Sequence, residues 1–332
     1  MTLYLLTGAA GFLGGNILKK LLADGQSVRA LVLPGDKYAS RIPEGVEVVT
    51  GDVTDPADLE RFFDVPAGTE RVVIHAAGIV TIYPGFSQKV WDVNVGGTRA
   101  VLEMCEKTGS KLVYVSSVHA IPPAPKGKEM DENAEFNPDL IRGFYGKTKA
   151  AATRLVLQAA RERGVKACVV FPSGLCGPGD TERGHVTQML VDCAGGRLPA
   201  GIEGGYDFAD VRDVAEGVIA AAKRGEPGEG YILGNRVVSV REIFRAVHEL
   251  TGAKLVKMMF PIPVAEAVTP FFEAYYKIKK RPPLFTKYSL YTLRSNSNFS
   301  HEKARRVLGY AVRPFSETLA DSLAWLRAEG RI

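Results

Sequence analysis

The sequence predicts an α/β fold, a doubly wound parallel sheet with helices on both faces and a smaller, mostly C-terminal lobe. Short apolar runs alternate with segments of helical periodicity through the first half of the chain. The first of these runs is closed by a glycine-rich turn, and the alternation loosens after Pro178. Strands that alternate with helices form right-handed crossovers, which produce a parallel sheet.

The composition is that of an ordinary globular protein with a large core. The 332 residues are 46% hydrophobic and 24% charged, with a formal net charge of +5. Because the basic residues are scattered, we expect no nucleic-acid surface. The cysteines show no CxxC spacing and lie in apolar sequence, which predicts buried reduced thiols rather than disulfides or a metal site. They are Cys105, Cys168, Cys176 and Cys193.

The chain shows no targeting or membrane signal. Its first residues enter a motif without a basic region or a cleavage site, so no signal peptide is expected. The most apolar later run, residues 258–276, is broken by prolines and glutamates and is not expected to span a membrane. These features predict a cytoplasmic protein.

The first strand is expected over residues 3–7, and a helix over residues 16–23, with the glycine turn between them. Gly8 permits a tight turn, Gly11 lets the backbone approach a pyrophosphate, and Gly14 allows close packing of helix and strand. The helix N-terminus then faces the phosphates. The spacing is GxxGxxG rather than the better-known GxGxxG, and a structural turn without ligand is the alternative.

The second strand, expected over residues 27–33, ends where the nucleotide cofactor is normally selected. An acid there binds the ribose 2′-hydroxyl of NAD, and a base binds the 2′-phosphate of NADP. The strand ends in apolar residues, so neither marker is present. Just beyond, Lys37 and Arg41 can reach a phosphate and Asp36 can reach a hydroxyl. The two bases favour NADP(H) over NAD(H).

Polar and small residues follow several of the next strands, which are expected over residues 46–49, 71–74, 111–115 and 165–171. After the first of them, Asp52 can accept a hydrogen bond from an adenine amino group, unless the acid there caps a helix. His75 has no second ligand spaced to join it and is expected to be a hydrogen-bonded structural histidine. Asn94 is expected to tie neighbouring strands together.

Tyr145 and Lys149 stand four residues apart at the start of an expected helix, so both project from one face. A nearby ammonium favours the phenolate, and lowering the pKa by about 3 corresponds to roughly 4 kcal/mol. Tyr145 then exchanges a proton near neutral pH, as alcohol–carbonyl chemistry requires. Ser117, at a strand's carboxyl end, can hydrogen-bond a substrate oxygen. The alternative is a surface pair on an amphipathic helix.

The second half of the chain is expected to hold helices from Asp207 and from Ser239, a short strand over 230–233 and a charged helix over 300–308. We divide the chain into two parts. Residues 1–173 form a dinucleotide-binding domain, to which residues 205–235 return. Residues 174–204 and 236–332 form a substrate-binding lobe.

Together these motifs closely resemble the extended short-chain dehydrogenase/reductase superfamily, also called the NAD-dependent epimerase/dehydratase family. The resemblance covers nearly the whole chain. It rests on TGAAGFLG (7–14), GDVTD (51–55), HAAG (75–78), YGKTK (145–149), GPGD (177–180), FADVRDVA (208–215), YILG (231–234) and KARRVLGY (303–310).

The resemblance implies a Rossmann-type fold and a set of roles. Tyr145 is the catalytic acid/base, Lys149 binds the nicotinamide ribose and lowers the pKa of Tyr145, and Ser117 positions the substrate carbonyl. The implied cofactor contacts are Gly8, Ala10, Gly11, Phe12, Leu13, Asp52, Val53, Ala76, Ala77, Gly78, Tyr145, Lys149, Pro172 and Ser173.

Departures from the family patterns indicate the branch. Val118 and His119 stand where dehydratases carry an Asp-Glu pair, and Tyr206 stands where sugar-nucleotide enzymes tend to carry an Arg. The C-terminal lobe is instead rich in apolar and aromatic side chains. They are Met258, Met259, Phe260, Phe271, Phe272, Tyr275, Tyr276, Phe285, Tyr288 and Tyr291. The combination is similar to the dihydroflavonol-reductase-like and 3β-hydroxysteroid-dehydrogenase-like branches.

By this resemblance the chain is expected to be an NAD(P)-dependent oxidoreductase that interconverts a carbonyl and an alcohol on an apolar small molecule, without a metal. A sugar or nucleotide-sugar epimerase is the alternative enzyme. A regulatory dinucleotide-binding protein that has lost catalysis is the alternative from another class. A homodimer through the Tyr145 helix is usual for the superfamily, although some members are monomers.

Overall fold

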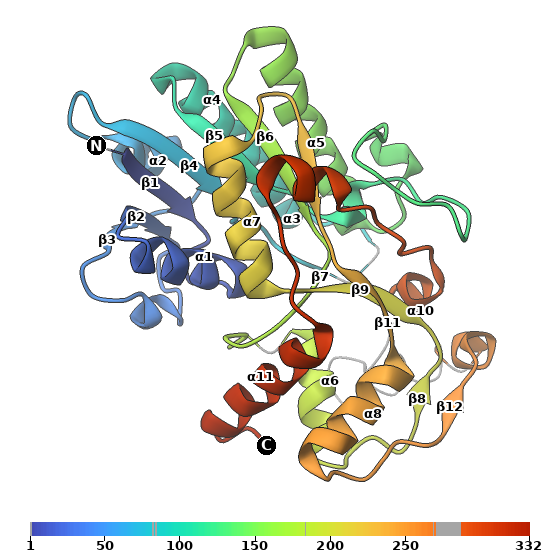
Figure 1. Ribbon diagram of the computed structural model, residues 1–332. Coiled ribbons are helices and arrows are strands. Elements are labelled where there is room, and N and C mark those ends of the chain that lie inside the picture. Colours follow the sequence, from blue (N-terminus) through green and yellow to red (C-terminus); the bar gives the residue numbers. More distant parts are fainter. Residues whose placement is uncertain (1, 82, 84, 183, 268, 270–286) are drawn as a thin grey trace.

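The computed structural model of the protein describes residues 2–81, 83, 85–182, 184–267, 269 and 287–332 (Figure 1). Its centre is a seven-stranded sheet in the order β10-β6-β5-β4-β1-β2-β3. All neighbouring strands in it are parallel. The strands are β1 (Thr2–Thr7), β2 (Ser27–Val32), β3 (Glu47–Thr50), β4 (Glu70–His75), β5 (Lys111–Val115), β6 (Ala167–Pro172) and β10 (Gly230–Leu233).

Helices cover both faces of this sheet. On one face lie α1 (Phe12–Ala23) and α7 (Val211–Arg224), which share one apolar cluster with the sheet. A second cluster joins the other face to α2 (Pro56–Phe63), α4 (Thr98–Thr108) and α5 (Phe144–Arg163). Figure 1 shows α1 and α7 in front of the sheet and the other three behind it. The predicted doubly wound α/β fold is confirmed.

The sheet also locates a ligand crevice. Strand β1 lies between β4 and β2, so β2 and β3 are added on one side of it and β4, β5 and β6 on the other. Ligands of such sheets bind at the carboxyl ends of the strands, beside this reversal point. The loops that follow β1, β4 and β5 therefore border the crevice.

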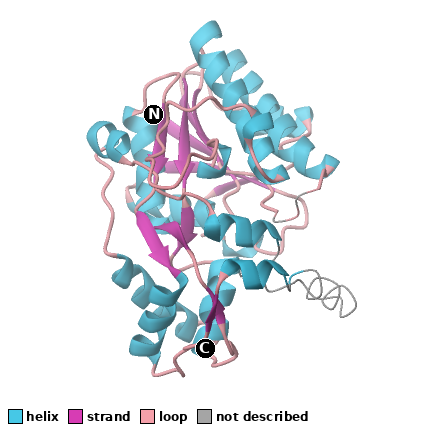
Figure 2. Cartoon of the chain, turned by 90° about the vertical axis from the view of Figure 1, so that its right-hand side faces the viewer, coloured by secondary structure: helices cyan, strands magenta, loops and turns pink. Residues whose placement is uncertain are grey.

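Several smaller elements, mostly from the second half of the described chain, form a second layer in the lower part of Figure 2. A three-stranded sheet has the order β11-β9-β7, and a two-stranded sheet pairs β12 with β8. The elements are β7 (Gly174–Cys176), α6 (His185–Ala194), β8 (Gly201–Ile202), β9 (Gly205–Asp210), β11 (Arg236–Ser239), α8 (Val240–Thr251), β12 (Met259–Phe260), α10 (Lys287–Arg294) and α11 (Phe315–Ala328).

Several expectations for this half are met. Ser239 caps α8, since its hydroxyl accepts a hydrogen bond from the N–H of Glu242. The short strand over 230–233 is β10, and a π-helical turn over Ala304–Leu308 lies within the expected charged helix. All of the cysteines are buried and free, and burial raises the pKa of each thiol.

The helix expected from Asp207 begins later. Residues Gly205–Asp210 form β9, and α7 starts at Val211, where the Asp210 carboxylate accepts from the N–H of Arg212. Strand β9 pairs with β7 and β11 rather than with the large sheet. Of the segment 205–235, therefore, α7 and β10 join the large sheet and β9 does not.

Asn94 does not tie strands together. It lies in a π-helical turn, Asp92–Gly97, which continues α3 (Gln88–Trp91) into α4. Its side-chain oxygen accepts from the N–H of Ile79, and its amide donates to the Thr148 hydroxyl at 3.0 Å. Asn94 thus fastens the loop after β4 to helix α5, which carries Tyr145.

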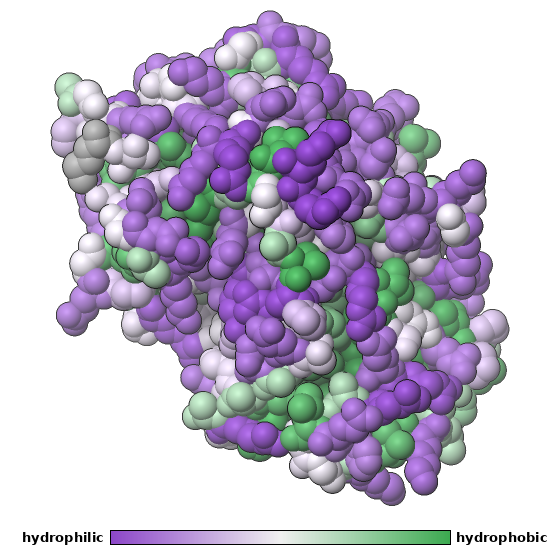
Figure 3. Space-filling model, viewed as in Figure 1, coloured by the Kyte–Doolittle hydropathy of each residue, from purple (hydrophilic) through white to green (hydrophobic). Residues whose placement is uncertain are grey.

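The surface is mostly hydrophilic on the face shown in Figure 3, and hydrophobic side chains gather toward the lower part of the view. The smaller layer contributes the exposed apolar side chains of Val237, Leu250, Met258, Phe260 and Val264. In the described part of the chain, no helix is long and apolar enough to cross a membrane. Phe271, Phe272, Tyr275, Tyr276 and Phe285 lie outside the described residues.

Candidate active site

The glycine turn after β1 is shaped by contacts within the chain at two of its three glycines. Gly8 has a φ of +75°, and a Cβ there would lie 2.8 Å from the backbone nitrogen of Ala77. A Cβ at Gly14 would lie 1.9 Å from the carbonyl oxygen of Gly8. At Gly11 a Cβ would meet only that same oxygen, at 3.4 Å. Packing thus requires Gly8 and Gly14, whereas Gly11 leaves its backbone open to a ligand.

Two neighbouring glycines of α1, Gly14 and Gly15, differ in the space around them. Alanine is therefore expected to change the stability of the protein in opposite directions at the two positions. Gly14→Ala is expected to destabilise the protein by about 1–3 kcal/mol or more, because the added methyl overlaps backbone atoms. Gly15→Ala is the matched control, since its Cβ would lie 3.6 Å from the nearest atom, the Ala9 oxygen. Alanine there should stabilise the helix by about 0.5–1 kcal/mol. Urea unfolding without added dinucleotide measures the free energy of unfolding of both variants. Equal values for the two variants would contradict the prediction.

The turn fits a dinucleotide phosphate. Helix α1 begins at Phe12 after Gly11, and no side chain caps it. The N–H groups of its first turn are therefore available to an anion, which the helix dipole also favours. Ala10, Phe12 and Leu13 lie at this end of the helix.

The loop after β4 is held beside the glycine turn. The N–H of Ala76 donates to the Thr7 carbonyl at 3.3 Å, and the N–H of Ala77 donates to the Thr7 hydroxyl at 3.2 Å. Gly78 follows, exposed, where a Cβ would lie 3.5 Å from Nζ of Lys149. Two of the predicted cofactor segments therefore lie against each other, and Lys149 lies beside the second of them.

The remaining predicted cofactor residues lie at the ends of β3 and β6. Asp52 accepts hydrogen bonds from the N–H and hydroxyl of Thr54, while the capping of α2 falls to Asp55. Val53 is buried against Gly97. Pro172 ends β6, and the N–H of the buried Ser173 donates to the Leu233 carbonyl.

Ser117, Tyr145 and Lys149 come together at the carboxyl end of β5, and all are buried. Ser117 caps a 3₁₀ turn, Val118–Ala120, by accepting from the N–H of His119. Tyr145 lies in the first turn of α5, where the nearby Ser117 side chain acts to lower the pKa of the Tyr145 hydroxyl. One turn later, Nζ of Lys149 donates to the Val115 carbonyl at 2.8 Å.

The expected depression of the Tyr145 pKa by Lys149 is not seen. Burial raises the pKa of Tyr145 to about 12, and the nearby Ser117 side chain partly opposes this rise. Burial also lowers the pKa of Lys149 to about 7. The expectation failed because desolvation penalises both the phenolate and the ammonium, which spacing along a helix cannot show. Tyr145 therefore keeps its proton at neutral pH and is poised as a proton donor.

His75 is a structural histidine, as expected. Its Nδ1 lies 2.8 Å from the Thr7 hydroxyl and its Nε2 lies 3.1 Å from the Thr98 hydroxyl. Burial lowers its pKa to about 3, so the imidazole is neutral. Among the described residues, no group of three His, Cys, Asp or Glu side chains is placed to hold a metal ion.

The structure adds a cluster that the sequence analysis did not assemble. His119 lies against Tyr145 with ring centroids 5.9 Å apart. Its Nε2 is 3.2 Å from the hydroxyl of Tyr206, and its Nδ1 is 3.3 Å from the hydroxyl of Tyr288. His119 and Tyr206 were noted only as departures from other branches, because no spacing links positions this far apart. We call His119, Tyr206 and Tyr288 the imidazole–phenol cluster.

The cluster borders a pocket with both polar and apolar walls, and its polar lining includes Thr292, Ser295 and Asn296. The apolar lining comes from Val118, Ile121, Pro123, Met130, Ile141 and Phe299. Arg142, the one cation of the lining, is exposed and its guanidinium lies 4.8 Å from the Tyr291 ring centroid. Apart from Arg142, the described residues that line this pocket include no Asp, Glu, Lys or Arg side chain.

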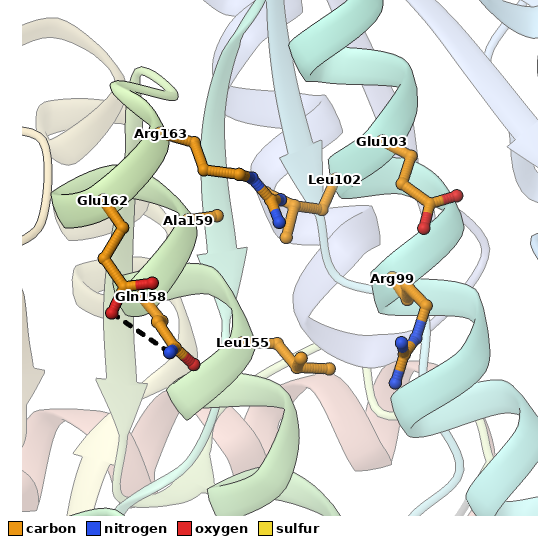
Figure 4. A pocket seen from close by; sticks show the side chains of 8 residues that line it. All are labelled: Arg99, Leu102, Glu103, Leu155, Gln158, Ala159, Glu162 and Arg163. Carbon is orange, nitrogen blue, oxygen red and sulfur yellow. Dashed lines mark hydrogen bonds between the residues drawn. The ribbon is translucent and has the colours of Figure 1, made fainter.

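A second hollow lies between α4 and α5 (Figure 4). Arg99 and Glu103 line it from α4, and Gln158, Glu162 and Arg163 from α5. Gln158 donates to Glu162 at 3.1 Å, so part of its polar lining is satisfied internally. Because these α5 residues lie several turns beyond Tyr145, this hollow is not part of the candidate active site.

Comparison with known proteins identifies the family. The model of the NAD dependent epimerase/dehydratase family matches residues 4–234. The crystal structure of gox2253 is similar over the whole chain, with a TM-score of 0.85, 32% sequence identity and coverage of 100% of this chain and 99% of that one.

Three relatives match along most of their length. Sterol demethylase protein B of Methylococcus capsulatus is 30% identical, with 99% of each chain covered. A putative dihydroflavonol 4-reductase of Synechocystis is 27% identical, covering 99% of this chain and 96% of the relative. A 3 beta-hydroxysteroid dehydrogenase/Delta 5-->4-isomerase of Mycobacterium tuberculosis is 30% identical, covering 92% and 85%. The chain therefore belongs to the NAD-dependent epimerase/dehydratase family, the extended short-chain dehydrogenases/reductases, and is a dehydrogenase-type enzyme.

Proposed function

We propose that the protein is an NAD(P)-dependent oxidoreductase that interconverts a carbonyl and an alcohol on an apolar small molecule. The observation that carries the proposal is the buried group of Ser117, Tyr145 and Lys149. His119, whose ring lies 5.9 Å from that of Tyr145, connects this group to the neighbouring pocket that it lines. Names of relatives that refer to a sterol, a hydroxysteroid and a dihydroflavonol support an apolar ring system as the substrate.

Each residue of the group has a distinct task in ketone reduction. A nicotinamide dinucleotide supplies the hydride chemistry when it is bound. The Ser117 hydroxyl hydrogen-bonds the carbonyl oxygen and orients it toward Tyr145. Tyr145, which burial keeps protonated at neutral pH, donates its proton to that oxygen. Lys149, next to the loop that ends at Gly78, holds the nicotinamide ribose.

The small number of cations in the pocket lining favours an uncharged substrate rather than a nucleotide sugar. A diphosphate group needs cations or several N–H donors to offset its charge. Tyr206 stands where a diphosphate-binding Arg was expected for the sugar-nucleotide branch, and its hydroxyl is engaged with His119. Within the pocket lining, Arg142 alone is cationic.

Net redox chemistry tests the proposal against the epimerase alternative. Purified protein is incubated with NADPH or NADH and a panel of apolar cyclic ketones, and the loss of reduced nicotinamide absorbance is followed. Bulk oxidation of the cofactor with formation of the alcohol supports the proposal. Tightly bound NAD that co-purifies, with no net redox, supports an epimerase. Binding of dinucleotide without either activity supports the regulatory alternative.

The preference for NADP(H) also stays a proposal, supported by two cations near one ring. Nζ of Lys37 and the guanidinium of Arg41 lie 4.8 and 5.6 Å from the Tyr38 ring centroid. The Asp36 carboxylate instead accepts the N–H of Tyr38 at 2.8 Å.

We expect Lys37→Ala and Arg41→Ala each to weaken NADPH binding by about tenfold and NADH binding by less than about twofold. The reason is that each variant removes about 1.4 kcal/mol of charge-assisted binding to the 2′-phosphate, which NADH lacks. Nicotinamide fluorescence titration measures both affinities. Lys19→Ala, on the surface of α1, is the matched charge control. Tighter binding of NADH than NADPH by the unmodified protein would contradict the preference and indicate Asp36 as the ribose ligand.

Three further expectations stay predictions. They are the division into a dinucleotide-binding domain and a substrate-binding lobe, a homodimer through the Tyr145 helix, and a cytoplasmic location.

A further inference from the structure

The imidazole–phenol cluster has one more hydrogen-bond donor than it uses. Both ring nitrogens of His119 have a phenol hydroxyl within hydrogen-bond distance, Tyr206 on one side and Tyr288 on the other. The Tyr206 ring also stacks on the imidazole, with centroids 5.7 Å apart and an angle of 15° between the planes. His119, Tyr206 and Tyr288 are therefore held in one arrangement.

The imidazole is neutral, because burial lowers the pKa of His119 to about 4. A neutral imidazole has one N–H and one lone pair. One tyrosine therefore donates its O–H to the ring, and the other accepts the ring N–H. This second tyrosine keeps its own O–H, whichever tautomer His119 adopts.

The retained O–H has no acceptor among the described residues. Neither phenol oxygen makes a hydrogen bond other than the one to His119 in that part of the chain. Tyr206 is buried and Tyr288 is partly buried, and both line the pocket beside Tyr145. A buried donor without an acceptor costs about 1–3 kcal/mol, so an acceptor supplied by a ligand is favoured there.

We propose that His119, Tyr206 and Tyr288 form a second polar subsite, which binds a neutral oxygen of the substrate away from the reacting carbon. The proposal rests on the proposed function, because it places the reacting carbonyl at Ser117 and Tyr145. The substrate is then an apolar ring system with a second carbonyl, ether or hydroxyl oxygen. The cluster itself offers no cation, so a carboxylate or phosphate is disfavoured.

The test compares ketones that differ in the second oxygen. The probes are 4-methoxycyclohexanone against 4-ethylcyclohexanone, and 5α-androstane-3,17-dione against 5α-androstan-3-one. The unmodified enzyme is expected to prefer the oxygenated partner of a pair by about three- to tenfold in kcat/KM, the effect of one hydrogen bond. Either Tyr206→Phe or Tyr288→Phe, whichever removes the retained O–H, should abolish this preference by raising KM for the oxygenated ketone more than for the plain ketone.

Tyr310→Phe is the matched control. It removes a buried phenol hydroxyl that has no hydrogen-bond partner in the described structure and lies against His301 instead. The preference should persist in this variant. Equal kcat/KM within both pairs for the unmodified enzyme, or a preference that survives both cluster variants, would overturn the subsite.

A separate readout distinguishes failure of the proposed function. If the enzyme reduces no ketone, the proposed function fails and the subsite is tested by NMR. The His119 imidazole signals are followed while each ketone is added in the presence of NADP⁺. A shift caused by the oxygenated ketone alone, and lost in one of the two cluster variants, supports the subsite. No shift with any probe overturns it.

Discussion

Tyr145→Phe is expected to lower kcat by about 10³-fold or more while changing dinucleotide affinity by less than about twofold. The variant retains the buried aromatic ring but removes the hydroxyl to which the proton-donor role is assigned. General acid–base catalysis contributes about 10²–10⁴-fold to rates, and the variant lacks the group that is proposed to transfer the proton.

Steady-state kinetics and a nicotinamide fluorescence titration measure the two effects separately. Tyr310→Phe, a buried phenol in the apolar cluster under α7, should retain the full rate. A Tyr145→Phe enzyme with near-normal kcat would remove the acid/base assignment. A parallel loss of dinucleotide binding would instead indicate that the variant is misfolded.

Lys149→Met is expected to lower kcat/KM by about 10²-fold and, near pH 6, to leave the protein at least as stable as before. Burial lowers the pKa of Lys149 to about 7, whereas an unfolded chain has a lysine pKa near 10.4. Burying the charged ammonium therefore destabilises the fold. The cost is about 1.4 kcal/mol for each unit by which the folded-state pKa lies below the unfolded-state pKa. Methionine removes that cost but leaves the Val115 carbonyl without its donor.

The pH dependence has a definite sign. Between about pH 7 and pH 10 the unfolded state binds the Lys149 proton and the folded state releases it, so this residue makes stability rise with pH. The stability gained by Lys149→Met should therefore be largest below pH 7 and shrink toward pH 10. Differential scanning calorimetry at pH 6 and pH 9.5 measures this. Lys147→Met, on the same helix, is the control, and an equal effect in both variants would refute burial as the cause.

The sequence alone was sufficient for the fold class, and it predicted a catalytic set, Ser117, Tyr145 and Lys149, whose members the fold brings together. The glycine turn, the alternation of strand and helix, and the motif from Tyr145 to Lys149 depend on local spacing. They identify the elements, and the parallel sheet then places the ends of β1, β4 and β5 at one edge. The family assignment follows from the same local motifs.

Tertiary structure decided what spacing cannot express. The pKa values of Tyr145 and Lys149 depend on burial by segments distant in sequence, and their direction opposed the local expectation. Asp207 lies in strand β9 rather than a helix because β7 and β11 flank it. The imidazole–phenol cluster joins a loop after β5, strand β9 and helix α10, so only the folded chain brings its three side chains into contact.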